Sequence, residues 1–167
     1  MRTKFLDISR QSQLYLVVLE NFFGLKVDPT DQNREDAKIL DDQGDVLAIV
    51  EIKGTTKGIK REYINQVDSH RERNELPLSM PGVLMINNEM SIEGITERLA
   101  TAVDDEQIKH AQNLNILIVR TIDLLFLMKH LENDPERKNK LINLLTAGGG
   151  WLKADSQKYE MIKIPKP

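Results

Sequence analysis

The segment IVEIKGTTKGIK, residues 49–60, places an acidic and a basic side chain at the end of an apolar run. Leu47 to Val50 are all apolar, which predicts a strand that is buried on both faces. Because side chains alternate between the two faces of a strand, we expect Glu51 and Lys53 on one face. Burying an acidic and a basic side chain on a core strand costs free energy unless the two charges are paired or take part in binding or catalysis. The pattern therefore marks both residues as candidates for chemistry.

A second carboxylate can join this pair through a predicted hairpin. Residues 37–53 contain two apolar runs that are separated by a turn rich in Asp and Gly, which is typical of a β-hairpin. A turn at residues 42–44 folds the two strands back on each other. We therefore expect Asp36 and Glu51 to meet at the same end of the sheet.

Two carboxylates at one point form a candidate site for a hard divalent cation. Asp36 and Glu51 would supply oxygen ligands, and the backbone carbonyl of Ile52 would supply a third. Lys53 would then lie beside the cation, where it could hold an attacking water or stabilise charge on a phosphate. These residue types are those that a divalent-metal hydrolase acting on a phosphate needs. The alternative is that Glu51 and Lys53 are an exposed cross-strand pair without a catalytic role.

The charges around the hairpin are unevenly distributed. Residues 28–45 contain seven acidic and two basic residues, a balance of −5, whereas residues 53–61 contain only basic ones. Three of those cations, namely Lys57, Lys60 and Arg61, either contact phosphates or form an ordinary solvated start of a helix. Turn chemistry accounts for Asp41, Asp42 and Asp45, and we favour that interpretation over metal ligation.

The rest of the chain predicts helices that alternate with strands. The expected elements are a helix over 5–23, a short strand over 25–27, the hairpin, a helix over 59–74, a strand over 82–87, a helix over 104–112, a strand over 115–119, helices over 124–131 and 136–145, and a terminal hairpin after the glycines at 148–150. This alternation predicts an α/β domain with a mixed sheet.

Length and composition set the class of protein. With 167 residues the chain is long enough for one domain with a core of its own. The chain has no cysteine, which suits a reducing compartment, and no apolar run long enough for a bilayer, so we expect a cytoplasmic protein without a membrane partner. A net charge of −3 does not by itself indicate a nucleic-acid binder.

The motif of Asp36 followed by Glu51-x-Lys53 resembles the PD-(D/E)XK nuclease superfamily, which has a restriction-endonuclease-like fold. The stretch VEIKGTTKGIKREYINQ is similar to the superfamily's strand and following helix, which carries a glutamine, here Gln66. The later stretches GVLMINN and NILIVRTIDLL look like its closing strands and terminal helix. The resemblance covers a core of about residues 5–131, with a C-terminal helix and hairpin over 132–167 as an addition.

The resemblance implies a mixed sheet of α-β-β-β-α-β order and magnesium-dependent cleavage of DNA, with Mn²⁺ able to substitute for Mg²⁺. It implies that Asp36 and Glu51 bind the metal, that Lys53 positions or activates water, and that Gln66 hydrogen-bonds a metal-bound water or a phosphate. The chain departs from the family pattern in having Glu35 before Asp36, where the superfamily has proline.

A second departure concerns the first helix, where many members place a glutamate that faces the metal. The candidates here are Glu20 and Gln13. We expect the lone histidines His70 and His110 to be structural, because their spacing fits no metal site. Trp151 is expected to anchor the core, although it could stack on a base.

Two functions remain open at this point. The first is a metal-dependent DNA nuclease, which would need a homodimer or two sequential events to cut both strands. The alternative is a non-catalytic or partner-activated DNA-binding or assembly module on the same fold, which would act with a larger partner protein.

Overall fold

The computed structural model describes residues 14–28 and 36–167, and of Asp36 it describes the backbone alone. Residues 14–17 are α-helical and lead into the π-helical turn η1. The labelled elements are η1 (Val18–Phe22), β1 (Lys26–Asp28), β2 (Asp36–Leu40), β3 (Val46–Gly54), α2 (Arg61–Arg73), β4 (Gly82–Asn87), α3 (Ile95–Ala100), α4 (Asp105–Asn113), β5 (Ile116–Arg120), α5 (Thr121–Leu131), α6 (Arg137–Thr146), β6 (Gly150–Ala154) and β7 (Tyr159–Ile162).

Within the described residues, the strands form one seven-stranded sheet whose order in space is the order of the chain, from β1 to β7. Strands β1, β2 and β3 pair antiparallel, β3 to β6 pair parallel, and β7 returns antiparallel to β6. This arrangement confirms the predicted α/β class and the mixed sheet. Up to β4 the elements run helix, three strands, helix, strand.

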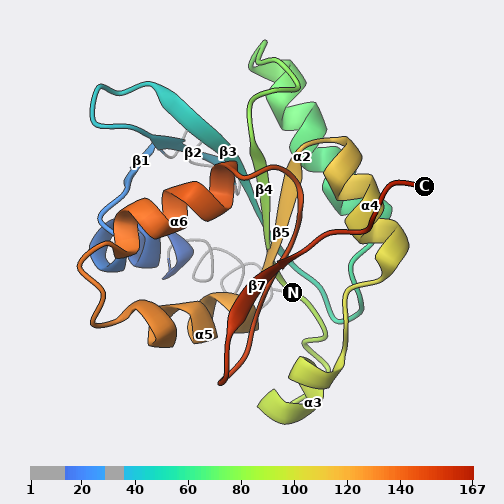
Figure 1. Ribbon diagram of the computed structural model, residues 1–167. Helices are drawn as coiled ribbons and strands as arrows, with labels where there is room; N and C mark the ends of the chain where they lie inside the picture. The colour runs from blue at the N-terminus through green and yellow to red at the C-terminus, as the bar shows by residue number, and fades with distance from the viewer. Residues whose placement is uncertain (1–13, 29–35) are drawn as a thin grey trace, which may run out of the picture.

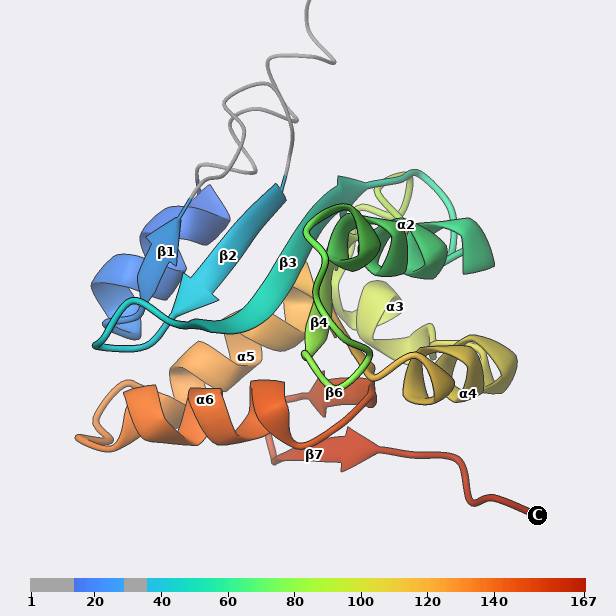
Figure 2. The same cartoon turned by 90° about the horizontal axis from the view of Figure 1, so that it is seen from above.

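Helices cover both faces of the sheet (Figures 1 and 2). Helices α2 and α4 pack on one face, while η1, α5 and α6 pack on the other. Strand β3 is buried between them, because the side chains of Ala48, Ile49 and Val50 are almost inaccessible to solvent. The uninterrupted apolar run in the sequence therefore marks a strand covered on both faces, as predicted.

The hairpin between β2 and β3 is closed by the turn that the sequence predicts. The amide of Asp41 donates to the carbonyl of Asp45 at 2.8 Å, and Gly44 adopts a φ of +91° that favours glycine. The carboxylate of Asp41 also accepts hydrogen bonds from the amides of Gln43 and Asp45. Asp41 is therefore a turn residue, which is the interpretation favoured from the sequence.

The C-terminal hairpin, which the sequence predicts as an addition to a core of about residues 5–131, is part of the sheet. Strand β6 pairs parallel with β5, and Trp151 on β6 is only 3% exposed. The short helix α3 was not predicted, because its six residues include none that is buried and so show no apolar stripe. Each helix within the described ranges is too short or too polar to cross a membrane.

A buried ionic network joins β5, α5 and β6. The guanidinium of Arg120 donates to both carboxylate oxygens of Asp123, at 2.7 and 2.9 Å, and both side chains are almost fully buried. The same carboxylate accepts hydrogen bonds from the indole of Trp151 at 2.9 Å and from the amide of Ala154 at 3.1 Å. Arg120 also donates to the carbonyl of Thr101 at 2.6 Å, so the network reaches the end of α3.

We expect Asp123→Asn to lower the free energy of unfolding by about 3–5 kcal/mol, because it leaves the buried Arg120 without its counterion. Urea denaturation followed by circular dichroism measures the change. The matched control is Glu160→Gln, which removes the charge from an exposed pair with Lys158 at 3.1 Å and should cost at most about 1 kcal/mol. Equal effects of the two substitutions would contradict this assignment.

Candidate functional site

The hairpin register places Asp36 directly opposite Glu51. Positions that face each other across an antiparallel pair are neighbours on one face of the sheet. The register is therefore the one that a site with two carboxylates requires. The side chain of Asp36 lies outside what the structure describes, and its role as a metal ligand stays a prediction.

Glu51 is a buried carboxylate that faces helix α2. It is 9% exposed, and its Oε2 atom lies 3.9 Å from Nδ1 of His70. His70 is itself buried, on the side of α2 that packs against the sheet. The sequence interpretation treated His70 as structural, since its spacing fits no metal motif. The missed signal is its helical spacing from Ile64 and Val67, which places His70 on the sheet-facing side.

Lys53 contacts the first turn of the same helix. Its ammonium lies 5.5 Å from the centre of the Tyr63 ring, within the range of a cation–π interaction. The Tyr63 hydroxyl in turn donates to Oγ1 of Thr55 at 3.5 Å. Tyr63 was assigned only to the apolar stripe of the helix, and its contact with Lys53 was not predicted.

Gln66 lies on the same side of α2 as these two contacts. Tyr63, Gln66 and His70 are spaced by three and four residues, so they form one strip along the helix. The other side of α2 faces the end of α4, because Arg71 donates to the carbonyl of Leu114 at 2.7 Å. Gln66 is exposed on this strip, and its contact with a bound group stays a prediction. We call Glu51, Lys53, Tyr63, Gln66 and His70 the β3–α2 cluster.

The three predicted phosphate contacts lie beside this cluster. Lys57, Lys60 and Arg61 are exposed in the loop after β3 and at the start of α2. Backbone hydrogen bonds fix the loop to the segment after β4: the amide of Thr55 donates to the carbonyl of Asn87 at 2.9 Å, and the amide of Glu89 donates to that of Lys57 at 3.0 Å. The cations are thus presented by an anchored loop.

The first-helix candidates remain predictions. Gln13 lies outside the described residues, and Glu20 is an exposed residue of η1. Two residues further on, the carbonyl of Phe22 accepts a hydrogen bond from Arg137 at 2.7 Å. At the other end of this helical segment, Tyr15 hydrogen-bonds Thr121, directly after β5. Glu20 therefore lies toward the α6 end of the segment.

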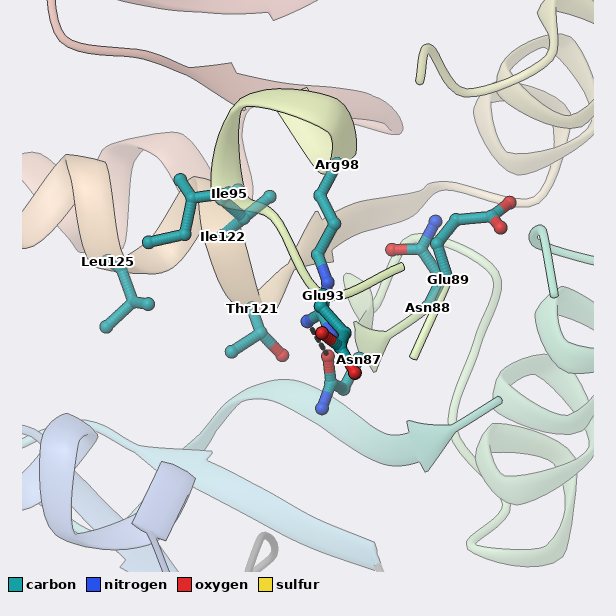
Figure 3. Close-up of a pocket in the computed structure, with 9 residues that line it drawn as sticks. All are labelled: Asn87, Asn88, Glu89, Glu93, Ile95, Arg98, Thr121, Ile122 and Leu125. Atoms are coloured by element: carbon teal, nitrogen blue, oxygen red, sulfur yellow. Dashed lines mark hydrogen bonds between the residues drawn. The ribbon is translucent and has the colours of Figure 1, made fainter. Parts of the chain in front are cut away.

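A pocket of about 150 Å³ opens at the carboxyl ends of β4 and β5 (Figure 3). Its lining residues are Asn87, Asn88, Glu89, Glu93, Ile95, Arg98, Thr121, Ile122 and Leu125. Arg98 donates from Nε to the carbonyl of Ile92 at 2.5 Å and from NH1 to Oδ1 of Asn87 at 3.5 Å. This pocket was not predicted from the sequence.

The oxygen donors of the hairpin fit a hard cation. The carboxylate of Glu51, the carbonyl of Ile52 and the register position of Asp36 offer the ligand type that Mg²⁺ and Mn²⁺ prefer. Across residues 14–28 and 37–167, the side chains form no group of three or more His, Asp or Glu that could hold a metal ion. The fit therefore depends on the carboxylate at position 36.

No protein-family model, curated protein or solved structure matches this chain. The functional interpretation therefore rests on the geometry of the β3–α2 cluster and on the motif that it contains.

We expect Asp36→Asn and Glu51→Gln each to weaken Mn²⁺ binding by at least about tenfold, because each replaces an anionic oxygen ligand by a neutral amide of the same size. Isothermal titration calorimetry measures the affinity. Asp41→Asn is the matched control, since the amide oxygen can still accept the turn hydrogen bonds, and it should bind Mn²⁺ like the parent. An unchanged affinity in Glu51→Gln would exclude Glu51 as a ligand.

Proposed function

We propose that this protein is a metal-dependent nuclease that hydrolyses phosphodiester bonds of DNA. The observation that carries the proposal is the hairpin register, in which Asp36 faces Glu51 and Lys53 follows two residues later on the same face. This is the arrangement that the resemblance to the PD-(D/E)XK superfamily implies.

The order of elements supports the same proposal at the level of the fold. From η1 to β4 the chain runs α-β-β-β-α-β, which is the order implied for a restriction-endonuclease-like core. In that interpretation, β5 and α5 are the closing strand and terminal helix of the core, and α6 with the hairpin β6–β7 completes the far edge of the sheet.

The proposed roles follow from the positions of the side chains. Asp36, Glu51 and the carbonyl of Ile52 would hold Mg²⁺, or Mn²⁺ in its place. A cation bound there would polarise the scissile phosphate and lower the pKa of a water molecule. Lys53 would hold the attacking water and stabilise the negative charge that develops on the phosphate. The water oxygen bonds to phosphorus as one P–O ester bond breaks, and the leaving oxygen gains a proton.

Neighbouring residues would support these roles. Tyr63 would keep the Lys53 ammonium in place through their cation–π contact. Gln66, on the same side of α2, would hydrogen-bond a phosphate oxygen or a bound water. The exposed cations after β3 would contact backbone phosphates, so DNA binding should weaken as salt rises.

An exposed apolar groove favours a second candidate, a module that acts on DNA only with a partner. The groove of about 360 Å³ is lined mainly by Phe22, Ile122, Leu125, Phe126 and Met128, between η1 and α5. Leu125 is 53% exposed, and open apolar patches of this kind often mark interaction sites. A chain that binds DNA with strong salt dependence, yet cuts it with neither Mg²⁺ nor Mn²⁺, would favour this candidate.

We expect Lys53→Ala to slow plasmid nicking with Mg²⁺ by at least about 100-fold, because it removes the cation beside the developing charge. Gel quantification of nicked plasmid over time measures the rate. Lys109→Ala, which removes an exposed cation from α4, is the matched control and should cut like the parent. Nicking by Lys53→Ala at the parental rate would refute the assignment.

A further inference from the structure

The pocket at the carboxyl ends of β4 and β5 takes no part in the proposed hydrolysis, yet it adjoins the site. Asn87, the last residue of β4, pairs in register with Gly54, which directly follows Lys53. Side chains alternate along the strand, so Asn87 lies on the face opposite to Lys53. The pocket and the β3–α2 cluster therefore share one edge of the sheet. In open α/β sheets, ligands bind at this carboxyl edge.

The pocket has one polar wall and one apolar wall (Figure 3). On the polar wall, Arg98 points at Asn87 and its hydrogen bond to Oδ1 orients the Asn87 amide. On the apolar wall, Ile95 and Leu125 are 60% and 53% exposed, so this wall is open to an incoming group. A ligand that fits both walls has a hydrogen-bonding edge and flat apolar faces.

The charges of the lining disfavour a phosphate as that ligand. Arg98 contributes one positive charge, whereas Glu89 and Glu93 contribute two negative ones, so the formal balance is −1. Phosphates are instead attracted to the exposed cations of the neighbouring loop. The two regions lie side by side, because the amide of Glu89 donates to the carbonyl of Lys57. A neutral nucleobase fits the polar and apolar walls of the pocket. The phosphates on either side of that base can then contact the cations of the loop.

We propose that this pocket binds a single unpaired base of the DNA substrate. The inference rests on the proposed function in taking DNA as the ligand, and it adds a substrate class. A base that is already unpaired needs less energy to leave the helical stack, so DNA with a bulge or a single-stranded end should bind more tightly than a perfect duplex.

The test compares two duplexes that differ by one extra unpaired adenosine. Fluorescence anisotropy in EDTA measures their affinities, and we expect the bulged duplex to bind about tenfold more tightly to the parent chain. Asn87→Leu removes the oriented amide, and Leu125→Ala shortens the exposed apolar wall. Each should bring the ratio of the two affinities close to one.

Two matched controls keep the tenfold ratio. Asn113→Leu makes the same substitution at an exposed residue of α4, and Leu78→Ala shortens a side chain that is 55% exposed at the other end of β4. Leu125 is exposed on a helix, so Leu125→Ala is expected to fold even where Asn87→Leu does not. A tenfold ratio that persists in a folded Leu125→Ala variant overturns the inference.

The outcomes separate this inference from the nuclease proposal. Equal affinity of the parent for both duplexes, together with metal-dependent nicking, overturns the pocket assignment alone. A tenfold ratio that depends on Asn87 and Leu125, in a chain that never nicks DNA, supports the pocket and overturns the nuclease. Binding of neither duplex overturns both.

Discussion

The buried pair of Arg120 and Asp123 connects the parts of the molecule that surround its carboxyl edge. One carboxylate accepts hydrogen bonds from the end of β5, from the indole of Trp151 and from the backbone of β6. Arg120 lies 4.7 Å from the Trp151 ring and also binds the carbonyls of Arg98 and Thr101. Charge burial is tolerated here because the Asp123 carboxylate accepts from Arg120, Trp151 and Ala154, while the remaining Arg120 donor is satisfied by backbone carbonyls. The wall of the pocket and the last two strands are thereby fixed together.

The candidate catalytic residues obey a different constraint, the two-residue period of a strand. Ala48, Val50 and Ile52 pack under η1 and the later helices, which leaves the alternate positions for Glu51 and Lys53. Helix α2 then supplies a partner to each, an imidazole near the acid and an aromatic ring near the ammonium. Polar chemistry is thus introduced into a buried strand without interrupting its apolar face.

Much of this arrangement could be predicted from local patterns, because hydrophobic period and turn chemistry act over short distances. The strand at 82–87 and the turn at Gly44 were predicted where they occur. The contacts of Tyr63 and His70 with β3 were not, because they depend on how α2 is rotated against the sheet. The position of β6 was missed for a related reason: pairing with β5 joins segments separated by two helices. Tertiary packing determines how a helix is rotated and which strands pair, and the periodicity of the sequence does not contain that information.

The strand order has a consequence for how the molecule is built. Since the seven strands lie in the sheet in the order in which they occur in the chain, each new strand adds to an edge that already exists. No strand has to insert between two earlier neighbours, and each ring of chain that closes is short compared with the whole. The strand order therefore allows the sheet to be built outward from one side through pairings of successive strands. Trp151 lies on β6, late in this order, and its indole completes the hydrogen bonds to the Asp123 carboxylate.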